Sequence, residues 1–194
     1  MRRLRLRRMG GDARGATIVE FALISPVMCV LIMGLGELAY ESYVQSVLDG
    51  AMDKAGRDST IQGANTTTID SLVLTQVHSV SSTATGVSTR KSYSTFGNIA
   101  PESFTDTNHN GIRDPGECFT DVNGNGTWDA DPGATGQGGA SDATVYTMTL
   151  TFPRLFPLFG WLGWSANRTI TATTILKNQP YATQTNITSA TVCT

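Results

Sequence analysis

The sequence predicts an α+β protein in which a long N-terminal helix crosses a membrane and continues into a small exported domain. A membrane-length apolar run follows a basic leader, and apolar side chains then recur at helical spacing between residues 38 and 55. Three later segments are rich in threonine, valine, tyrosine and isoleucine, which favours an antiparallel sheet of about three strands. At 194 residues the chain has room for one modest domain besides an anchor.

The pattern divides the chain into five parts. Residues 1–15 form a basic leader, and residues 16–40 form a transmembrane segment. Residues 41–97 hold an amphipathic helix, a second helix and the first strand, and residues 98–143 form an acidic insertion rich in glycine and asparagine. Residues 144–194 supply the C-terminal strands.

The leader determines the expected orientation in the membrane. It holds six of the fourteen Lys and Arg residues and a single acid, Asp12. Without it, eight basic and fifteen acidic residues remain, a formal net charge of −7. Arginine-rich flanks stay in the cytoplasm, so we expect a single-pass protein with a cytoplasmic N-terminus and an exported C-terminal domain. Basic arms that bind nucleic acid are not normally followed by an apolar segment of this length, so we expect no nucleic-acid partner.

The anchor begins with one carboxylate. From Phe21 to Gly36 the chain carries no charge, and the whole run exceeds the twenty or so residues that span hydrocarbon, so contact with membrane lipid is expected. Pro26 is expected to bend this helix. Glu20 lies near the start of the run, where a charged side chain is costly and needs a partner or a purpose.

The segment Gly15-Ala16-Thr-Ile-Val-Glu20-Phe21 resembles the N-terminus of type IV pilin-like proteins. Its Gly-x-x-x-x-Glu-Phe variant resembles the TadE-like minor pseudopilins of tight-adherence (Flp-type) pilus systems. The resemblance implies that a prepilin peptidase cuts between Gly15 and Ala16, and that Glu20 pairs with the new N-terminal ammonium of a neighbouring subunit. It also implies a bacterial cytoplasmic (inner) membrane location or a place in the pilus, a periplasmic or extracellular domain, and contacts with other pilin-like subunits and the pilus assembly platform.

Beyond the anchor, the spacing predicts one continuous helix over about 18–58, followed by a shorter helix over about 69–80 that Asn65 caps. Strands are expected at about 86–96, 145–152 and 169–176, packed as a sheet on the outer half of the long helix. Glycine, proline and acidic residues between 98 and 142 predict a long loop without regular structure there.

An apolar stretch from Pro153 to Trp164 separates the last two predicted strands. It is too short to span a membrane. Its aromatic side chains suit core packing, and Trp161 and Trp164 also suit the bilayer interface. With the following threonine-rich strand, this stretch looks like the end of TadE-like proteins, so that the resemblance covers about 14–96 and 144–181.

The acidic insertion contains a calcium-loop pattern. Residues 106–117 fit the Asp-x-Asn-x-Asn-Gly-x5-Glu spacing of an EF-hand loop, in which alternating oxygens converge on one Ca²⁺ and the glycine permits a sharp turn. The expected ligands are Asp106, Asn108, Asn110, the carbonyl of Ile112, Asp114 and Glu117.

Phe-Thr-Asp recurs fifteen residues later and begins a second copy. Its expected ligands are Asp121, Asn123, Asn125, Thr127 and Asp129, with Asp131 in place of the closing carboxylate because Pro132 occupies the twelfth position. Six carboxylates in this segment would repel one another, and calcium would offset that repulsion. The alternative is an acidic Asn-Gly-rich turn that folds without metal.

The two exported cysteines, Cys118 and Cys193, could form one disulfide in an oxidising compartment. No phosphate-binding glycine loop, zinc pattern or serine-hydrolase motif is present, so we expect a non-enzymatic protein. The sequence therefore favours a TadE-like minor pseudopilin that takes part in pilus assembly. The alternative function is a signal-anchored, calcium-binding surface adhesin that never enters a pilus.

Overall fold

The computed structural model describes residues 14–61, 63–156, 160, 163–179 and 188–193. It consists of two compact units. The first combines Met1–Tyr43 with Arg154–Ala166, and the second combines Val44–Pro153 with Asn167–Thr194. Most of the basic leader and Trp161 lie outside the described residues.

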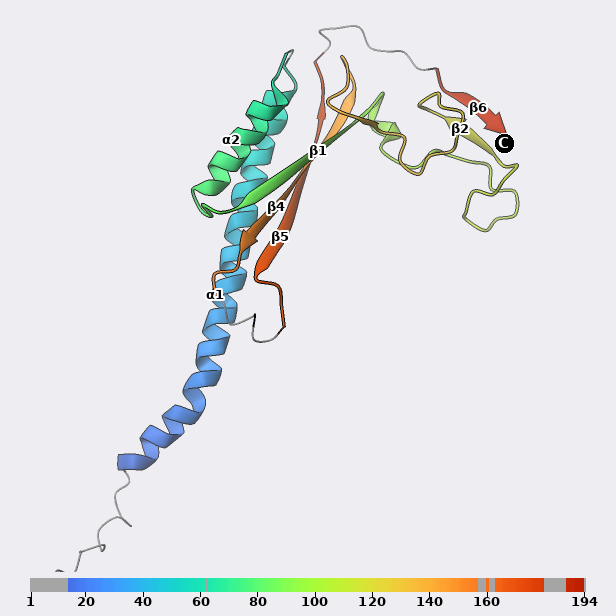
Figure 1. Cartoon of the computed structure of the whole chain (residues 1–194). Coiled ribbons are helices and arrows are strands. Elements are labelled where there is room, and N and C mark those ends of the chain that lie inside the picture. Colours follow the sequence, from blue (N-terminus) through green and yellow to red (C-terminus); the bar gives the residue numbers. More distant parts are fainter. Residues whose placement is uncertain (1–13, 62, 157–159, 161–162, 180–187, 194) are drawn as a thin grey trace, which may run out of the picture. The chain divides into compact units, whose positions relative to one another are not determined.

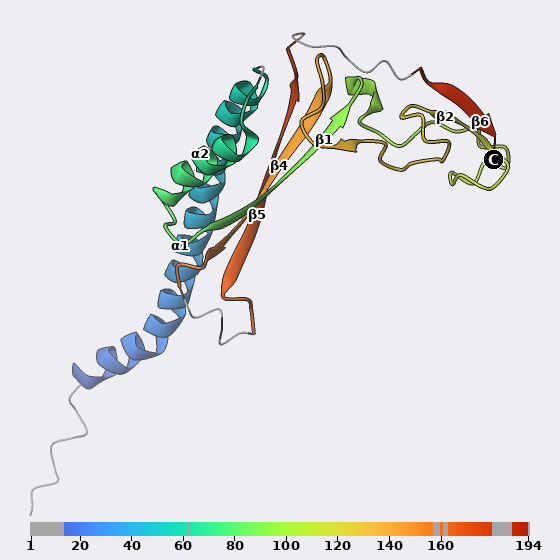
Figure 2. The same ribbon diagram turned by 45° about the horizontal axis from the view of Figure 1, so that its top comes forward.

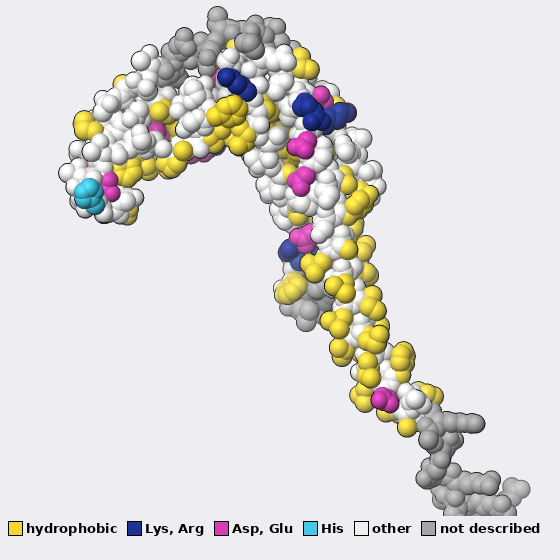
Figure 3. Space-filling view, turned by 180° about the vertical axis from the view of Figure 1, so that it is seen from behind, with side chains coloured by type: hydrophobic (Ala, Val, Ile, Leu, Met, Phe, Trp, Pro, Cys, Tyr) yellow, Lys and Arg dark blue, Asp and Glu magenta, His cyan; other side chains and the backbone are white. Residues whose placement is uncertain are grey.

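The long helix predicted from the sequence is confirmed. Helix α1 runs from Arg14 to Ser59 and remains helical through Pro26 (Figure 1). Large apolar side chains of its first half are exposed, and Figure 3 shows them covering this part of the helix. In length and composition α1 is able to cross a membrane, which is consistent with a single-pass anchor.

The second helix is confirmed as well. Helix α2 runs from Thr66 to His78, and the side chain of Asn65 accepts a hydrogen bond from the Thr68 N–H at 3.0 Å. This cap satisfies one of the amides that a helix N-terminus leaves without an internal partner. Its buried side chains, Ile69, Val73 and Val77, recur at helical spacing.

The main sheet has four antiparallel strands in the order β3-β1-β4-β5 (Figure 2). The three predicted strands correspond to β1 (Thr85–Tyr93), β4 (Ala143–Pro153) and β5 (Asn167–Lys177). The fourth is a short strand, β3 (Ala134–Thr135), which pairs with the end of β1.

A second, two-stranded sheet joins β2 (Cys118–Asp121) to β6 (Ala190–Cys193). The expectation of no regular structure between 98 and 142 was therefore wrong at β2 and β3, and a short 3₁₀ helix also lies at Phe96–Asn98. Local sequence could not show β2, because this four-residue strand depends on a partner, β6, that lies about seventy residues later in the chain.

The core of the second unit lies between the helices and one face of the sheet. The outer half of α1 buries Val44, Leu48, Ala51, Met52 and Ala55. Their spacing of three or four residues places them on one face of the helix. Strand β4 buries every second residue, namely Tyr146, Met148, Leu150 and Phe152.

The opposite face of the sheet carries threonines. Across β4 and β5, Thr147 faces Thr173, Thr149 faces Thr171 and Thr151 faces Thr169, with hydroxyl oxygens 3.0, 3.4 and 3.2 Å apart. Such cross-strand pairs stabilise an exposed sheet face without adding apolar surface.

Candidate functional site

The residues of the predicted processing site occupy the first turns of α1. Gly15, Ala16, Glu20 and Phe21 are all exposed, and a Cβ atom on Gly15 would meet no other atom within 4 Å. In the part of the chain that the structure describes, Glu20 forms no ion pair.

A second acid of α1 was missed by the sequence analysis. Glu37 is 4% exposed, and its Oε2 accepts hydrogen bonds from the N–H groups of Leu155 and Phe156 at 3.0 and 3.2 Å. Arg154 lies 3.6 Å from its other oxygen. Glu37 thus fastens the start of the aromatic stretch to α1. Its partners lie more than a hundred residues away, so local spacing carried no signal for this contact.

The first calcium-loop sequence folds around its first and ninth residues. Asp106 accepts hydrogen bonds from the N–H groups of Asn110 and Gly111 at 3.2 and 2.8 Å. Asp114 Oδ2 accepts the side-chain amides of Asn108 and Asn110 at 2.7 and 2.8 Å. Gly111 has a positive φ of 76°, which a side chain would strain.

The twelfth residue closes this loop. Glu117 is 7% exposed, and its two carboxylate oxygens accept the N–H groups of Thr107 at 2.7 Å and Asp114 at 3.0 Å. Ile112 at position seven, whose backbone carbonyl is the sixth predicted ligand, is exposed. The five predicted side-chain ligands therefore belong to one hydrogen-bonded loop.

The second copy has the same internal contacts. Asp121 Oδ2 accepts the N–H of Gly126 at 2.8 Å, the counterpart of the Gly111 contact, and Gly126 also has a positive φ, 78°. Asp129 Oδ2 accepts the side-chain amides of Asn123 and Asn125 at 2.8 and 2.6 Å. Burial raises the pKa of Asp121, but the N–H group of Gly126 and its neighbours outweigh this effect and hold that pKa below its usual value.

Amide groups donate to the carboxylates of both loops. Among the described residues, no three His, Cys, Asp or Glu side chains converge as a metal-binding group. In each loop the asparagine Nδ2 atoms point at the carboxylate of the ninth residue. The donors themselves are the carboxylate and amide oxygens that Ca²⁺ prefers. An entering ion would require these amides to turn their oxygens inward.

Asp131 lies outside this arrangement. Its carboxylate accepts hydrogen bonds from the Lys91 ammonium and, at 2.8 Å, from the Tyr93 hydroxyl, both on β1. These contacts hold the pKa of Asp131 below its usual value. Asp131 therefore joins the loop segment to the sheet through Lys91 and Tyr93.

A disulfide links Cys118 to Cys193 across the β2–β6 pair, where the two residues face each other in register. Cys118 follows Glu117 directly. The bond thus fastens the C-terminal strand next to the closing residue of the first loop.

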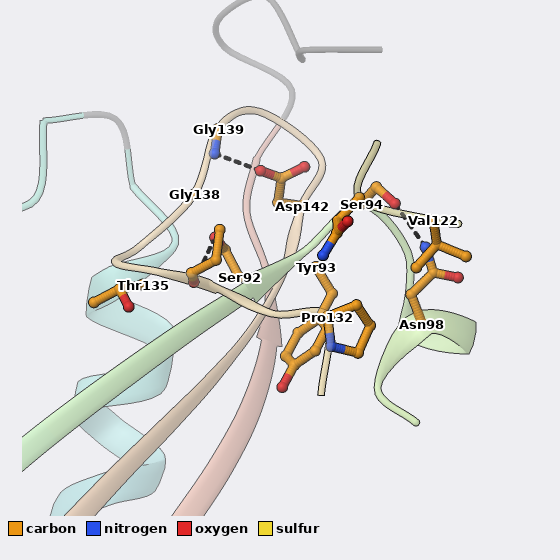
Figure 4. A pocket seen from close by; sticks show the side chains of 12 residues that line it. Ser92, Tyr93, Ser94, Asn98, Val122, Pro132, Thr135, Gly138, Gly139 and Asp142 are labelled. Carbon is orange, nitrogen blue, oxygen red and sulfur yellow. Dashed lines mark hydrogen bonds between the residues drawn. The ribbon is translucent and has the colours of Figure 1, made fainter. Parts of the chain in front are cut away.

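A cleft of about 390 Å³ lies beside these loops (Figure 4). Two of its polar lining groups are hydrogen-bonded within the fold: Asp142 accepts the Gly139 N–H at 2.6 Å, and the Ser92 hydroxyl donates to the Ala134 carbonyl at 3.3 Å. The lining, which lies wholly in the described part of the chain, includes no His, Cys, Lys or Arg.

Asp70 on α2 is the centre of a charged cluster in the second unit. It accepts hydrogen bonds from Arg90, Tyr146 and Ser88 at 2.6, 2.5 and 2.6 Å. Burial raises the pKa of Asp70, but these donors, with Arg90 the strongest, outweigh burial and lower it overall. Arg90 also stacks on the Tyr146 ring, 3.9 Å from its centroid. The cluster fastens α2 to the sheet.

The family model described as TadE-like protein matches residues 15–57, which form nearly all of α1. The chain has no match among curated proteins or among solved structures. The family match associates α1 with tight-adherence pilus systems and with a family that is non-enzymatic in general. It ends before α2, so both sheets and the acidic loops lie outside it.

Proposed function

We propose that the chain is a non-enzymatic TadE-like minor pseudopilin that takes part in assembling a tight-adherence pilus. One observation carries the proposal. The family match covers residues 15–57, which form a single helix with an exposed apolar first half, and its first turns hold Gly15 and Glu20 at the spacing of the pilin-like processing site. An unpaired acid near the end of a membrane helix is costly unless another subunit compensates its charge.

In this proposal a prepilin peptidase cuts after Gly15 and leaves Ala16 as the first residue. The new ammonium of one subunit then pairs with Glu20 of its neighbour. The exposed first turns of α1 support access by both partners, because the described residues leave this carboxylate without an ion pair. The protein would span the cytoplasmic membrane once, with its N-terminus inside and its sheet domain exported. A disulfide suits that exported compartment.

The exported domain would bind calcium in its two acidic loops and present them to other pilus components or to a surface. Two loops with matching contacts, each with a glycine of positive φ at the sixth position, support this role. Calcium sites of extracellular modules work at affinities of about 10⁻⁴ to 10⁻³ M, so weak binding would suffice.

A surface adhesin is the second candidate, because the acidic loops lie outside the family match. It predicts an uncut leader and no dependence of pili on the protein. The two functions are separated by deleting the gene and counting pili by electron microscopy, with cell adhesion measured in parallel.

The pseudopilin proposal expects deletion to abolish pili and adhesion together. Wild-type protein should restore both, and Glu20→Ala should not. Asp53→Ala is the matched control, since Asp53 is an exposed acid on the same helix beyond the anchor, and it should restore pili fully. Normal pili in the deletion strain, with adhesion lost, would refute the proposal and support the adhesin.

A further inference from the structure

The two acidic loops belong to a longer internal repeat that begins with a glutamate. Glu102-Ser-Phe-Thr-Asp106 starts the first copy, and Glu117-Cys-Phe-Thr-Asp121 starts the second, fifteen residues later. Glu117 is also the twelfth and closing residue of the first loop. The second loop has Pro132 at its twelfth position and so carries no closing carboxylate of its own.

The starts of the two copies pair with each other. Phe104 and Phe119, equivalent residues of the repeat, form an antiparallel bridge. The Thr105 N–H donates to the Cys118 carbonyl at 2.8 Å. In the same way, the Thr120 N–H donates to the carbonyl of Ser103, the counterpart of Cys118, at 2.8 Å. Reciprocal contacts of this kind relate the two copies by a local two-fold axis.

That axis exchanges the two glutamates. Glu117 binds the N–H groups of the second and ninth residues of the first loop. Glu102 binds those of the second and ninth residues of the second loop, Val122 and Asp129, at 2.8 and 3.0 Å. The two backbone contacts also match, since the Glu102 N–H donates to the Asp129 carbonyl at 3.0 Å and the Glu117 N–H to the Asp114 carbonyl at 3.1 Å.

We propose that Glu102 is the closing carboxylate ligand of a calcium site in the second loop, although it precedes that loop by nineteen residues. Glu117, which begins the second copy, closes the first loop in the ordinary way. In this arrangement each copy of the repeat supplies the carboxylate that closes the loop of the other copy. This inference rests on the proposed calcium binding of the exported domain.

Burial and charge support a cation beside these groups. Glu102, Glu117 and Asp121 are 3%, 7% and 4% exposed. Within the described residues, none of the three forms an ion pair with a Lys, Arg or His side chain. A buried carboxylate without a compensating positive charge is costly even when it accepts hydrogen bonds. Asp131, by contrast, is 46% exposed at its side chain and already paired with Lys91.

The second loop carries its own spectroscopic probe. Trp128 is the eighth residue of that loop, and its Nε1–H donates to the Glu102 carbonyl at 2.8 Å. The first loop contains no tryptophan. Terbium, a luminescent substitute for Ca²⁺, should therefore be excited through Trp128 when it occupies the second loop, and Trp128→Phe should remove that signal.

The experiment uses the full chain in detergent micelles. Calcium titration calorimetry counts the sites, and terbium luminescence reports the second loop. Wild type should bind two ions. Glu102→Gln, which keeps the size and one acceptor oxygen, should weaken the second site at least about tenfold and leave the first unchanged, because it removes a charged, bidentate ligand. Glu117→Gln should weaken the first site, and Asp131→Asn should leave both intact.

The outcomes separate the two proposals. Two sites in wild type that persist in Glu102→Gln, or a second site lost in Asp131→Asn, would overturn the assignment of Glu102 and leave calcium binding standing. A single wild-type site removed by Glu117→Gln alone would also overturn it. No binding at all in wild type would overturn calcium binding itself. The disulfide content and circular dichroism of each variant check that it has folded.

Discussion

Replacement of Asp70 should loosen helix α2 from the sheet. Asp70→Ala would leave the Arg90 guanidinium, whose side chain is 8% exposed, without its carboxylate partner, and the Tyr146 hydroxyl without its acceptor. Ser88 would lose its acceptor as well. The cost of the change is therefore dominated by the polar groups that stay buried.

The size of the effect follows from this geometry. Breaking a fully buried ion pair from one side costs about 3 to 5 kcal/mol. The side chain of Asp70 is 22% exposed, so water can partly compensate, and we expect about 2 to 4 kcal/mol for Asp70→Ala. Asp70→Asn keeps an acceptor oxygen without the charge and should cost about 1 to 2 kcal/mol.

Urea unfolding of the full chain in micelles, followed by tryptophan fluorescence and circular dichroism, measures these free energies. Asp53→Ala, an exposed acid on α1, is the control and should change stability by less than about 0.5 kcal/mol. Equal stabilities of Asp70→Ala and this control would refute the role given to the Asp70 cluster.

The stability difference between Asp70→Asn and wild type should depend on pH. The folded pKa of Asp70 is below its ordinary value of 3.8, so the contribution of Asp70 to stability is complete above that pH. The contribution is lost as the pH falls through the folded pKa. Asp70→Asn should therefore lose less stability in acid than wild type, and parallel acid profiles would contradict this.

Three further predictions concern the second unit. Replacing Cys118 and Cys193 by serine opens a link between residues 75 positions apart and should cost on the order of 4 kcal/mol in urea unfolding, whereas wild-type stability after replacement would contradict it. Leu48→Ala empties a fully buried site and should cost about 2 to 5 kcal/mol, against little change for the exposed Leu72→Ala. Burial and Asp131 raise the pKa of Tyr93 to about 12, so alkaline absorbance titration should show a late phenol ionisation that Tyr93→Phe lacks. The stabilising effect of the neutral Tyr93 phenol is present below pH 10 and is lost as the pH rises through about 12.

The elements that the sequence predicted well are those whose signals are local. Periodic apolar positions along α1 and α2, the Asn65 cap and three β-branched strands each carry their own pattern, and the structure confirms them. The contacts that the sequence did not predict join residues far apart in the chain. Nothing near Glu37 indicates Leu155, and nothing near β2 indicates β6.

The acidic loops show the same limit within a single motif. Position-by-position spacing predicted which side chains share each loop. For the second loop's closing carboxylate it pointed to Asp131, which contacts Lys91 and Tyr93 in the structure. The contacts of Glu102 depend on a two-fold pairing of the copies, and only a three-dimensional structure can show that pairing.

The first residue of the membrane-embedded protein tests the central claim most directly. Intact mass and N-terminal peptide analysis should be carried out in cells with and without their prepilin peptidase. Pilin-type processing predicts a chain that begins at Ala16 only when the peptidase is present. A chain that keeps the arginine leader in both strains would contradict the pseudopilin function and favour an anchored, calcium-binding adhesin.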